Sequence, residues 1–325
     1  MNTASLLGLP GLEDDLERIE AALLEATAAA DPFLSEVAGH LAGAGGKRLR
    51  PALCTAAVRA AGAPVTDGVI LGGVATELVH LGSLYHDDVM DDADSRRGVE
   101  SVNSRWGNLV AILAGDFLMA RASEIAASLG TEVAGLLGAT IGRLCEGQVG
   151  ELQTAFNVDR TEDAYLASIS GKTASLTAAA CRIGGIVATL PRTSIDALTS
   201  FGEALGMVFQ IRDDILDVIG TDEELGKPAG QDLVEGTYSL PVLRALADPA
   251  IGPELRPLLG RPLEAPERDK AREIIRQSSA VAEATAVAHE WAAQAEIALF
   301  PLGDSALTAS LAGSARRLAD SITDR

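Results

Sequence analysis

Residues 69–92 read VILGGVATELVHLGSLYHDDVMDD, an apolar run that ends in four aspartates. Apolar residues recur along it at spacings of three and four positions, which is the period of an α-helix. Between Val69 and Leu84, only Glu77 and His80 interrupt the run with titratable side chains. On a helix, Asp87 and Asp91 lie one turn apart and point the same way, whereas Asp88 points about 100° round the axis. We therefore expect a buried helix with paired carboxylates at its carboxyl end.

The helical period continues through most of the chain. Apolar residues recur at helical spacing from Leu12 to Ile322, and aromatic residues make up only 3% of the 325 residues. Alternating runs of Val, Ile and Tyr, which would predict strands, are few. The glycines and prolines show no triplet period, and the composition is that of a globular protein, which excludes collagen and disorder. We predict an all-α fold, a single domain over residues 1–325.

The net charge and the cysteine content of the chain restrict its possible partners and its cellular compartment. The chain has 26 basic and 46 acidic residues, a net charge of −20, which argues against nucleic acid as a partner. Cys54, Cys145 and Cys181 are odd in number and too widely spaced for a zinc knuckle, which indicates buried thiols in a reducing compartment. Charged residues interrupt the most apolar stretches, so we expect no membrane span, no signal peptide and a cytoplasmic protein.

A second acidic motif, FQIRDDILD at residues 209–217, also closes an apolar helical run. Asp213 and Asp217 again stand four positions apart, with Asp214 beside the first. A solvated acidic helix end is the alternative interpretation of either motif alone. Two such motifs in one chain favour hard divalent cations such as magnesium, which prefer oxygen ligands and also bind phosphate.

Basic residues, scarce in this chain, occur beside glycines in four short motifs. These are GGKRLRP at 45–51, RRG at 96–98, GKT at 171–173 and GKP at 226–228. Exposed backbone N–H groups together with lysine or arginine side chains can form a binding site for an anion. Each motif alone is more often a surface charge. Together with two acidic clusters, however, they point to a diphosphate substrate.

The order of the motifs resembles that of the trans-polyprenyl (isoprenyl) diphosphate synthases. The resemblance rests on the motifs already quoted, and on DDVMDDADSRRG (87–98), GDFLMARA (115–122), GQVGEL (147–152), FQIRDDILDVIG (209–220) and GKPAGQDLVEGTYSLP (226–241). It implies a helical bundle of the isoprenoid synthase type around a deep central cavity, usually as a homodimer. It also implies head-to-tail condensation of isopentenyl diphosphate with an allylic diphosphate, assisted by three magnesium ions and completed by loss of a proton.

The resemblance also assigns residues to roles by position. The direct magnesium ligands would be Asp87, Asp91 and Asp213, supported by Asp88, Asp214 and Asp217. The allylic substrate would be held by Arg96, Lys172, Thr173, Gln210 and Lys227, with Lys172 and Lys227 also acting in catalysis. Isopentenyl diphosphate would be bound by Gly46, Lys47, Arg50, His80 and Arg97. One position departs from the pattern, because Thr237 stands where many members have lysine. This predicts one phosphate contact fewer.

Product length is predicted from the helix below the first aspartate motif. Four and five positions before Asp87 stand Ser83 and Gly82, and Val79 and Leu78 lie a further turn away. Short-chain members resemble this chain but have bulky aromatic residues at the first pair. By this resemblance we expect a medium- to long-chain all-trans product of about six to ten isoprene units, with a farnesyl or geranylgeranyl diphosphate synthase as the alternative. Alternatively, Gly82 and Ser83 allow a neighbouring helix to pack closely.

Other functions stay open at this point. Glu77 and His80 form an ExxH pattern that can ligate iron in helical bundles, but His40, His86 and His289 supply no second one. A class I terpene cyclase would share the acidic motifs but would need no isopentenyl diphosphate site. A non-catalytic subunit of a heteromeric synthase would be expected to have degraded acidic motifs, whereas both are intact here.

Overall fold

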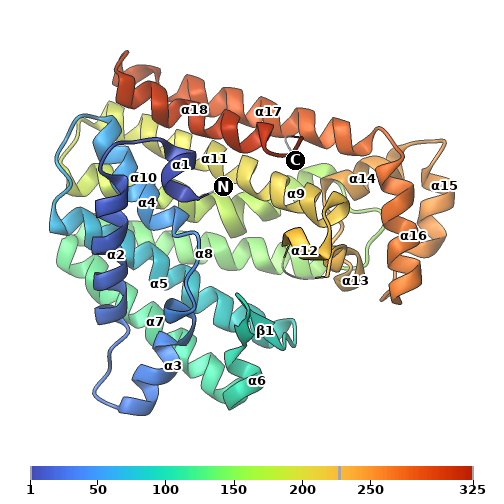
Figure 1. Ribbon diagram of the computed structural model, residues 1–325, viewed down its shortest axis with the longest axis horizontal. Helices are drawn as coiled ribbons and strands as arrows, with labels where there is room; N and C mark the ends of the chain where they lie inside the picture. Colours follow the sequence, from blue (N-terminus) through green and yellow to red (C-terminus); the bar gives the residue numbers. More distant parts are fainter. Residues whose placement is uncertain (1, 226–227, 324–325) are drawn as a thin grey trace. The chain divides into compact units, whose positions relative to one another are not determined.

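The computed structural model describes residues 2–225 and 228–323, and these are largely helical (Figure 1). Within the described ranges the only strands are β1 (Ser95–Arg96) and β2 (Val99–Glu100). They form an antiparallel hairpin in which Arg96 pairs with Val99. The predicted all-α fold is therefore confirmed.

The helices have the following bounds. Up to residue 153 they are α1 (Thr3–Leu7), α2 (Leu12–Ala26), α3 (Pro32–Gly43), α4 (Leu49–Ala60), α5 (Asp67–Met90), α6 (Val102–Trp106), α7 (Asn108–Leu129) and α8 (Thr131–Gln153). After it they are α9 (Glu162–Ile169), the π-helical turn η1 (Ser170–Ala174), α10 (Ser175–Val187), α11 (Arg192–Ile219), α12 (Asp222–Leu225), α13 (Gln231–Glu235), α14 (Leu240–Ala247), α15 (Gly252–Leu255), η2 (Arg256–Leu258), α16 (Ala265–Arg276), α17 (Ala280–Ala298), η3 (Phe300–Leu302) and α18 (Ala306–Asp320).

Two compact units make up the chain, each assembled from three segments. Unit 1 contains residues 1–141, 176–202 and 298–311, and unit 2 contains residues 142–175, 203–297 and 312–325. The first aspartate motif belongs to unit 1 and the second to unit 2. That the whole chain forms a single domain stays a prediction.

Helix α5 is the central element of unit 1 and packs against α2, α4 and α7. It begins after Thr66, whose hydroxyl oxygen accepts a hydrogen bond from the backbone N–H of Val69. The negative charge of Asp67 in the first turn interacts favourably with the positive end of the helix dipole. Most side chains between Val69 and Tyr85 are buried. The helix thus carries the first aspartate motif from the core of the unit to its surface.

The same helix is long and apolar enough to cross a membrane when judged by length and composition alone. Its most apolar 18-residue window has a mean hydropathy of 1.3, and 72% of that window is buried inside the protein. The expectation that no stretch would qualify is therefore wrong for α5, because Glu77 and His80 are too few to lower the mean. Burial of this extent is typical of the core helix of a globular protein.

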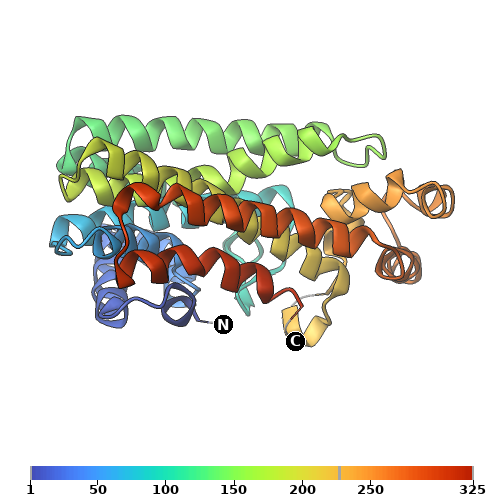
Figure 2. The ribbon, with the colours of Figure 1, turned by 90° about the horizontal axis from the view of Figure 1, so that it is seen from above.

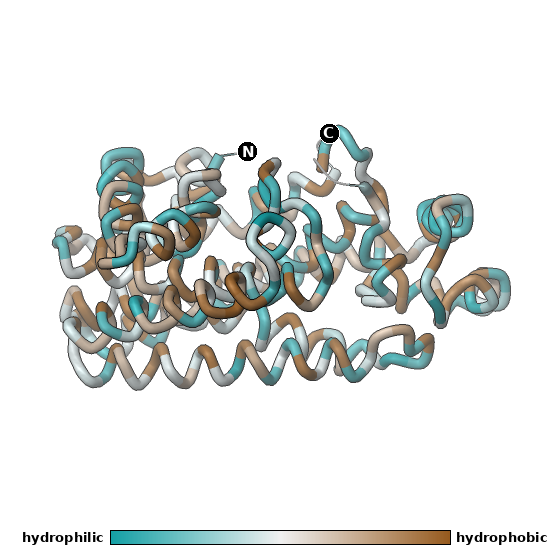
Figure 3. Tube along the Cα trace, turned by 90° about the horizontal axis from the view of Figure 1, so that it is seen from below, coloured by the Kyte–Doolittle hydropathy of each residue, from teal (hydrophilic) through white to brown (hydrophobic). Residues whose placement is uncertain are grey.

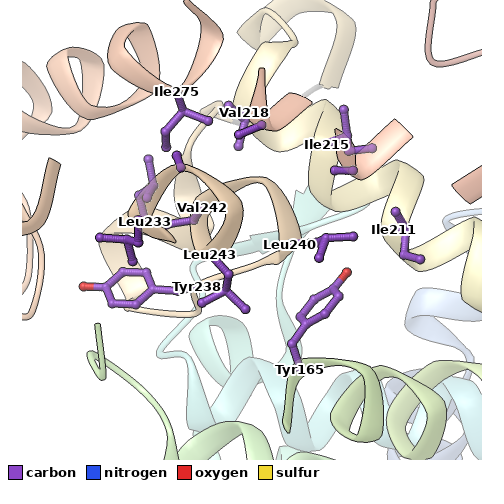
Figure 4. Close-up of a cluster of buried hydrophobic side chains, with 14 of the residues drawn as sticks. Tyr165, Ile211, Ile215, Val218, Leu233, Tyr238, Leu240, Val242, Leu243 and Ile275 are labelled. Carbon is purple, nitrogen blue, oxygen red and sulfur yellow. The ribbon is translucent and has the colours of Figure 1, made fainter. Parts of the chain in front are cut away.

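Unit 2 has a hydrophobic core of its own, which Figure 4 shows in close-up. Tyr165 of α9 and Ile211 and Ile215 of α11 are buried in it, together with Leu240 and Val242 of α14. Helix α14 also packs against α15 and α16, which belong to the orange segment in Figure 2. Hydrophobic and hydrophilic residues are interleaved along the helices, as one-sided burial requires (Figure 3).

Candidate active site

The first aspartate motif lies at the carboxyl end of α5. Asp87 is half-buried in the last turn, and Asp91 caps the helix with its N–H donating to the carbonyl oxygen of Asp87 over 2.8 Å. This hydrogen bond confirms that the two aspartates are one helical turn apart. Asp92 follows in a left-handed conformation with φ of 49°, which ends the helix. Asp87 and Asp91 therefore stand where α5 meets the surface.

Asp88 differs from its neighbours because it is fully buried and paired. Nη2 and Nε of Arg96 contact its Oδ1 at 2.6 and 2.7 Å, whereas its Oδ2 is buried without a hydrogen-bond partner. Burial raises the pKa of Asp88, and the charge of Arg96 acts in the opposite direction. This ion pair connects the β1–β2 hairpin, which carries Arg96, to the first aspartate motif. Asp88 was predicted to support magnesium binding and Arg96 to bind the allylic substrate, but the structure pairs them with each other.

Arg97, in the turn of the same hairpin, packs on the glycine loop at residues 45–46. It adopts a left-handed conformation with φ of 56°, and its guanidinium donates to the carbonyl oxygens of Gly45 and Leu41. Gly46 has φ of 148°, and a Cβ atom there would lie 2.8 Å from the Arg97 guanidinium carbon. The predicted residues Gly46 and Arg97 are therefore brought into contact, and only glycine fits at position 46.

His80 lies within a group of arginines in unit 1. Burial lowers its pKa well below the ordinary value, and the charges of Arg50, Arg97, Arg48 and Arg96 lower it further. His80 is therefore a neutral side chain among four guanidinium groups. Carboxylates accompany three of these arginines, because Arg48 and Arg97 contact Glu77 and Arg96 contacts Asp88.

Glu77 holds this group together, a role that the sequence did not predict. Its carboxylate is buried, 3.1 Å from Nη1 of Arg48 and 3.8 Å from Nη2 of Arg97. Arg48 also contacts Glu20 at 2.6 Å and donates to the carbonyl oxygen of Ala42. A carboxylate within an apolar helical run was the signal that this residue is paired inside the protein.

The four positions predicted to set product length are all buried in α5. Leu78 and Val79 have no exposed surface, and the hydroxyl group of Ser83 donates to the carbonyl oxygen of His80 over 2.8 Å. A Cβ atom at Gly82 would lie 3.0 Å from the carbonyl oxygen of Gly115 and 3.2 Å from the side chain of Met119. Gly82 therefore lies at the crossing of α5 and α7, as the alternative interpretation of this glycine anticipated.

The second aspartate motif lies inside α11, in unit 2. Asp214 is buried and accepts hydrogen bonds from the hydroxyl group of Tyr165 (2.6 Å) and from Nε2 of Gln210 (2.7 Å). Burial raises the pKa of Asp214 to about 7, although both hydrogen bonds lower it. Asp217 is buried as well and accepts from the N–H of Asp232 at 3.1 Å, while Asp213 is more exposed and contacts Arg212.

The predicted allylic residues of unit 2 meet at the π-helical turn η1. Lys172 contacts Glu151 of α8 at 2.6 Å, and the hydroxyl group of Thr173 donates to Oε1 of Gln210 over 2.7 Å. The turn fits closely against α8, because a Cβ atom at Gly147 would lie 2.5 Å from the backbone nitrogen of Lys172. Thr173, Gln210 and Asp214 thus form one hydrogen-bonded chain, and Lys172 precedes it in the sequence. Lys227 lies outside the described residues.

The donors at both motifs are carboxylate oxygens, which suit magnesium. Among residues 2–225 and 228–323, no three histidine, cysteine or acidic side chains come together closely enough to hold a metal ion by themselves. Glu77, one half of the ExxH pattern, contacts Arg48 and Arg97 instead. The carboxylates of the two motifs fit magnesium, which usually binds through one or two carboxylates and completes its coordination with water and phosphate oxygens.

An all-helical fold with aspartate motifs and adjoining arginine and lysine groups defines the class of isoprenoid synthases. The family model for polyprenyl synthetases matches residues 31–277, so the chain belongs to the polyprenyl synthetase family and is a prenyltransferase. This confirms the resemblance drawn from the motifs.

Several characterised proteins are similar to it. The chain is 41% identical to component 2 of the heptaprenyl diphosphate synthase of Geobacillus stearothermophilus, covering 75% of this chain and 78% of that one. It is 40% identical to the nonaprenyl diphosphate synthase of Mycobacterium tuberculosis, covering 84% and 82%. A polyprenyl synthase from Caulobacter crescentus, solved in complex with calcium and isoprenyl diphosphate, matches with a TM-score of 0.90, 32% identity and coverage of 100% and 98%.

Proposed function

We propose that this enzyme condenses isopentenyl diphosphate with an allylic diphosphate, head to tail, to give a medium- to long-chain all-trans polyprenyl diphosphate. The observation that carries the proposal is the packing of Arg97 on Gly45 and Gly46, next to Arg48 with which it shares Glu77. Such a group in an acidic protein is suited to bind a diphosphate. A class I terpene cyclase needs no site of this kind, because it does not use isopentenyl diphosphate.

In the proposed reaction, the two aspartate motifs hold magnesium, with Asp87, Asp91 and Asp213 as direct ligands and the buried Asp88, Asp214 and Asp217 in support. Three ions is the number that the family resemblance implies. When bound, magnesium supplies charge neutralisation for the departing diphosphate of the allylic substrate.

The cationic and polar side chains bind and orient the two substrates. Thr173 and Gln210, connected to Asp214 as described, would hold the allylic diphosphate together with Lys172, Arg96 and Lys227. Gly46, Lys47, Arg50, His80 and Arg97 would hold isopentenyl diphosphate. Lysine and arginine stabilise the charge that develops on the leaving group as the carbon–oxygen bond breaks. The released diphosphate accepts the proton that is lost after the new carbon–carbon bond forms.

A homodimer is the proposed assembly. Leu109, Ile112 and Leu113 of α7 are exposed large hydrophobic side chains within two turns of one helix. A contiguous apolar surface of this kind is typical of an interface. Cys54 and Cys181 are buried as expected, whereas the expectation of burial is wrong for Cys145, which is exposed; all three are free thiols, which supports the cytoplasm as the proposed location.

Radiolabelled isopentenyl diphosphate, one allylic primer at a time and magnesium test the proposed reaction. We expect label in an extended prenyl diphosphate, no incorporation after chelation of magnesium, and loss of nearly all turnover in Asp87→Ala and Asp213→Ala. Consumption of the allylic substrate without label would instead identify a cyclase. A protein that is inactive alone but active with a second component would support a heteromeric synthase, the assembly suggested by the name of the Geobacillus relative.

A further inference from the structure

Arg160, in the loop between α8 and α9, is a buried cation with unused hydrogen-bond donors. Only 6% of the residue is exposed, and its Nη1 donates to the carbonyl oxygen of Tyr238 over 3.2 Å. Its Nε and Nη2 are buried and have no hydrogen-bond partner. Arginine stays charged in proteins, and a buried charge without hydrogen bonds is costly. An unsatisfied guanidinium of this kind calls for an anion.

The groups around Arg160 belong to the candidate active site of unit 2. Its guanidinium carbon lies 5.6 Å from the centre of the Tyr165 ring, and the charges of Glu151 and Asp214 act on it. Both carboxylates already have other partners, because Glu151 contacts Lys172 and Asp214 accepts from Tyr165. Arg160 is therefore linked through Tyr165 to Asp214 of the second aspartate motif, and no carboxylate accepts a hydrogen bond from its Nε or Nη2.

The loop that carries Arg160 is fastened on both sides of Thr237. The N–H of Phe156 donates to the carbonyl oxygen of Gly236 over 2.9 Å, and Arg160 donates to that of Tyr238. Gly236 has φ of 75°, and a Cβ atom there would lie 2.4 Å from the Phe156 ring. Thr237 is the position at which the family pattern commonly has lysine, so an arginine from another loop stands next to the place of the missing cation.

We propose that Arg160 binds the diphosphate group of the allylic substrate and supplies the positive charge that lysine at position 237 would otherwise supply. This inference rests on the proposed prenyl transfer. Both free donors are buried beside Tyr165, whose hydroxyl group donates to Asp214 of the second aspartate motif.

Calorimetric titration with inorganic diphosphate and magnesium tests the inference without requiring turnover. We expect Arg160→Gln to weaken binding about 10- to 100-fold, the effect of losing a hydrogen bond to a charged group. Adding Thr237→Lys to that variant should recover most of the loss. Arg256→Gln, which removes an exposed arginine paired with Asp159, is the matched control and should bind as the parent does.

Two results would overturn the inference. One is unchanged diphosphate affinity in a folded Arg160→Gln variant, with only its melting temperature lowered, because this would show a purely structural role. The second result comes from a measurement that does not need the Arg160→Gln variant to fold. It follows the Nε–H NMR signal of Arg160 in the parent protein, which is assigned by its loss in Arg160→Lys. We expect this signal to shift when diphosphate and magnesium are added, and an unmoved signal contradicts the inference. Failure of the proposed prenyl transfer is distinguishable from failure of this inference. In the first case the parent protein would bind diphosphate but would make no prenyl product.

Discussion

The hydroxyl group of Tyr165 donates a hydrogen bond of 2.6 Å to Oδ2 of the buried Asp214. Tyr165→Phe would leave that oxygen without its donor, so we expect the free energy of unfolding to fall by about 1–3 kcal/mol. We also expect turnover to fall about 10-fold or more, as for other residues that orient metal ligands. Urea denaturation and steady-state kinetics measure the two effects.

Tyr238→Phe is the control for this variant, because it removes another buried tyrosine hydroxyl, one that accepts from the N–H of Gly260 at 2.6 Å. It should reduce stability but leave turnover nearly unchanged. Equal losses of turnover in the two variants would show that Tyr165 acts only through stability.

The raised pKa of Asp214 leads us to expect that the stability of the metal-free protein depends on pH. Burial raises its pKa from 3.8 to about 7, so the folded protein keeps a proton that the unfolded chain has lost above about pH 4. Stability conferred by this proton therefore falls as pH rises from about 4 to 7, by at most about 1.4 kcal/mol per pH unit. Asp214→Asn should lack this slope in urea denaturation with a chelator. A difference between variant and parent that stays constant with pH would contradict the assignment.

Glu77→Gln should affect unit 1 selectively. The change leaves the buried Arg48 and the partly buried Arg97 without their shared carboxylate, and we expect a loss of about 3 kcal/mol in the free energy of unfolding. Because Arg97 would be released, the Michaelis constant for isopentenyl diphosphate should rise more than that for the allylic substrate. Glu20→Gln, at the exposed side of Arg48, is the control and should cost less than about 1 kcal/mol. Equal rises for both substrates would mean that these arginines do not define one pocket.

Gly82 and Ser83 should respond differently to larger side chains. Gly82→Ala places a methyl group against Gly115 and Met119, so we expect a loss of stability of about 1–3 kcal/mol from overpacking. Ser83→Phe should shorten the product with activity retained, if the growing chain passes this level. A shortened product from a fully stable Gly82→Ala protein would instead place Gly82 at the passage.

The periodic features of the sequence predicted the framework well. The apolar run of α5 and that before Asp213 gave two long helices because their spacing and length leave little ambiguity. The one-turn separation of Asp87 and Asp91 follows from the same period. The two glycines at 45–46 were interpreted only as exposed backbone, and the structure adds that both adopt backbone conformations that favour glycine.

Pairings between distant segments could not be predicted from the sequence. The Asp88–Arg96 pair was not expected, because its two residues were assigned to different roles by position. Tyr165 and Arg160 were not predicted, because both lie outside the motifs. Tyr165 is recognised only by its hydrogen bond to Asp214, 49 residues away in the chain, and Arg160 only by its hydrogen bond to Tyr238, 78 residues away. Gly82 faces α7 because of how two helices cross, and the period of one helix cannot reveal its neighbour.

Sizing the product tests the central claim most directly. Purified enzyme would be incubated with magnesium, labelled isopentenyl diphosphate and a farnesyl or geranylgeranyl primer, and the dephosphorylated products separated by chain length. The account predicts all-trans prenyl chains of about six to ten isoprene units, because the small residue Ser83 stands one turn before Asp87. Products that end at farnesyl or geranylgeranyl diphosphate, with excess isopentenyl diphosphate remaining, would contradict it.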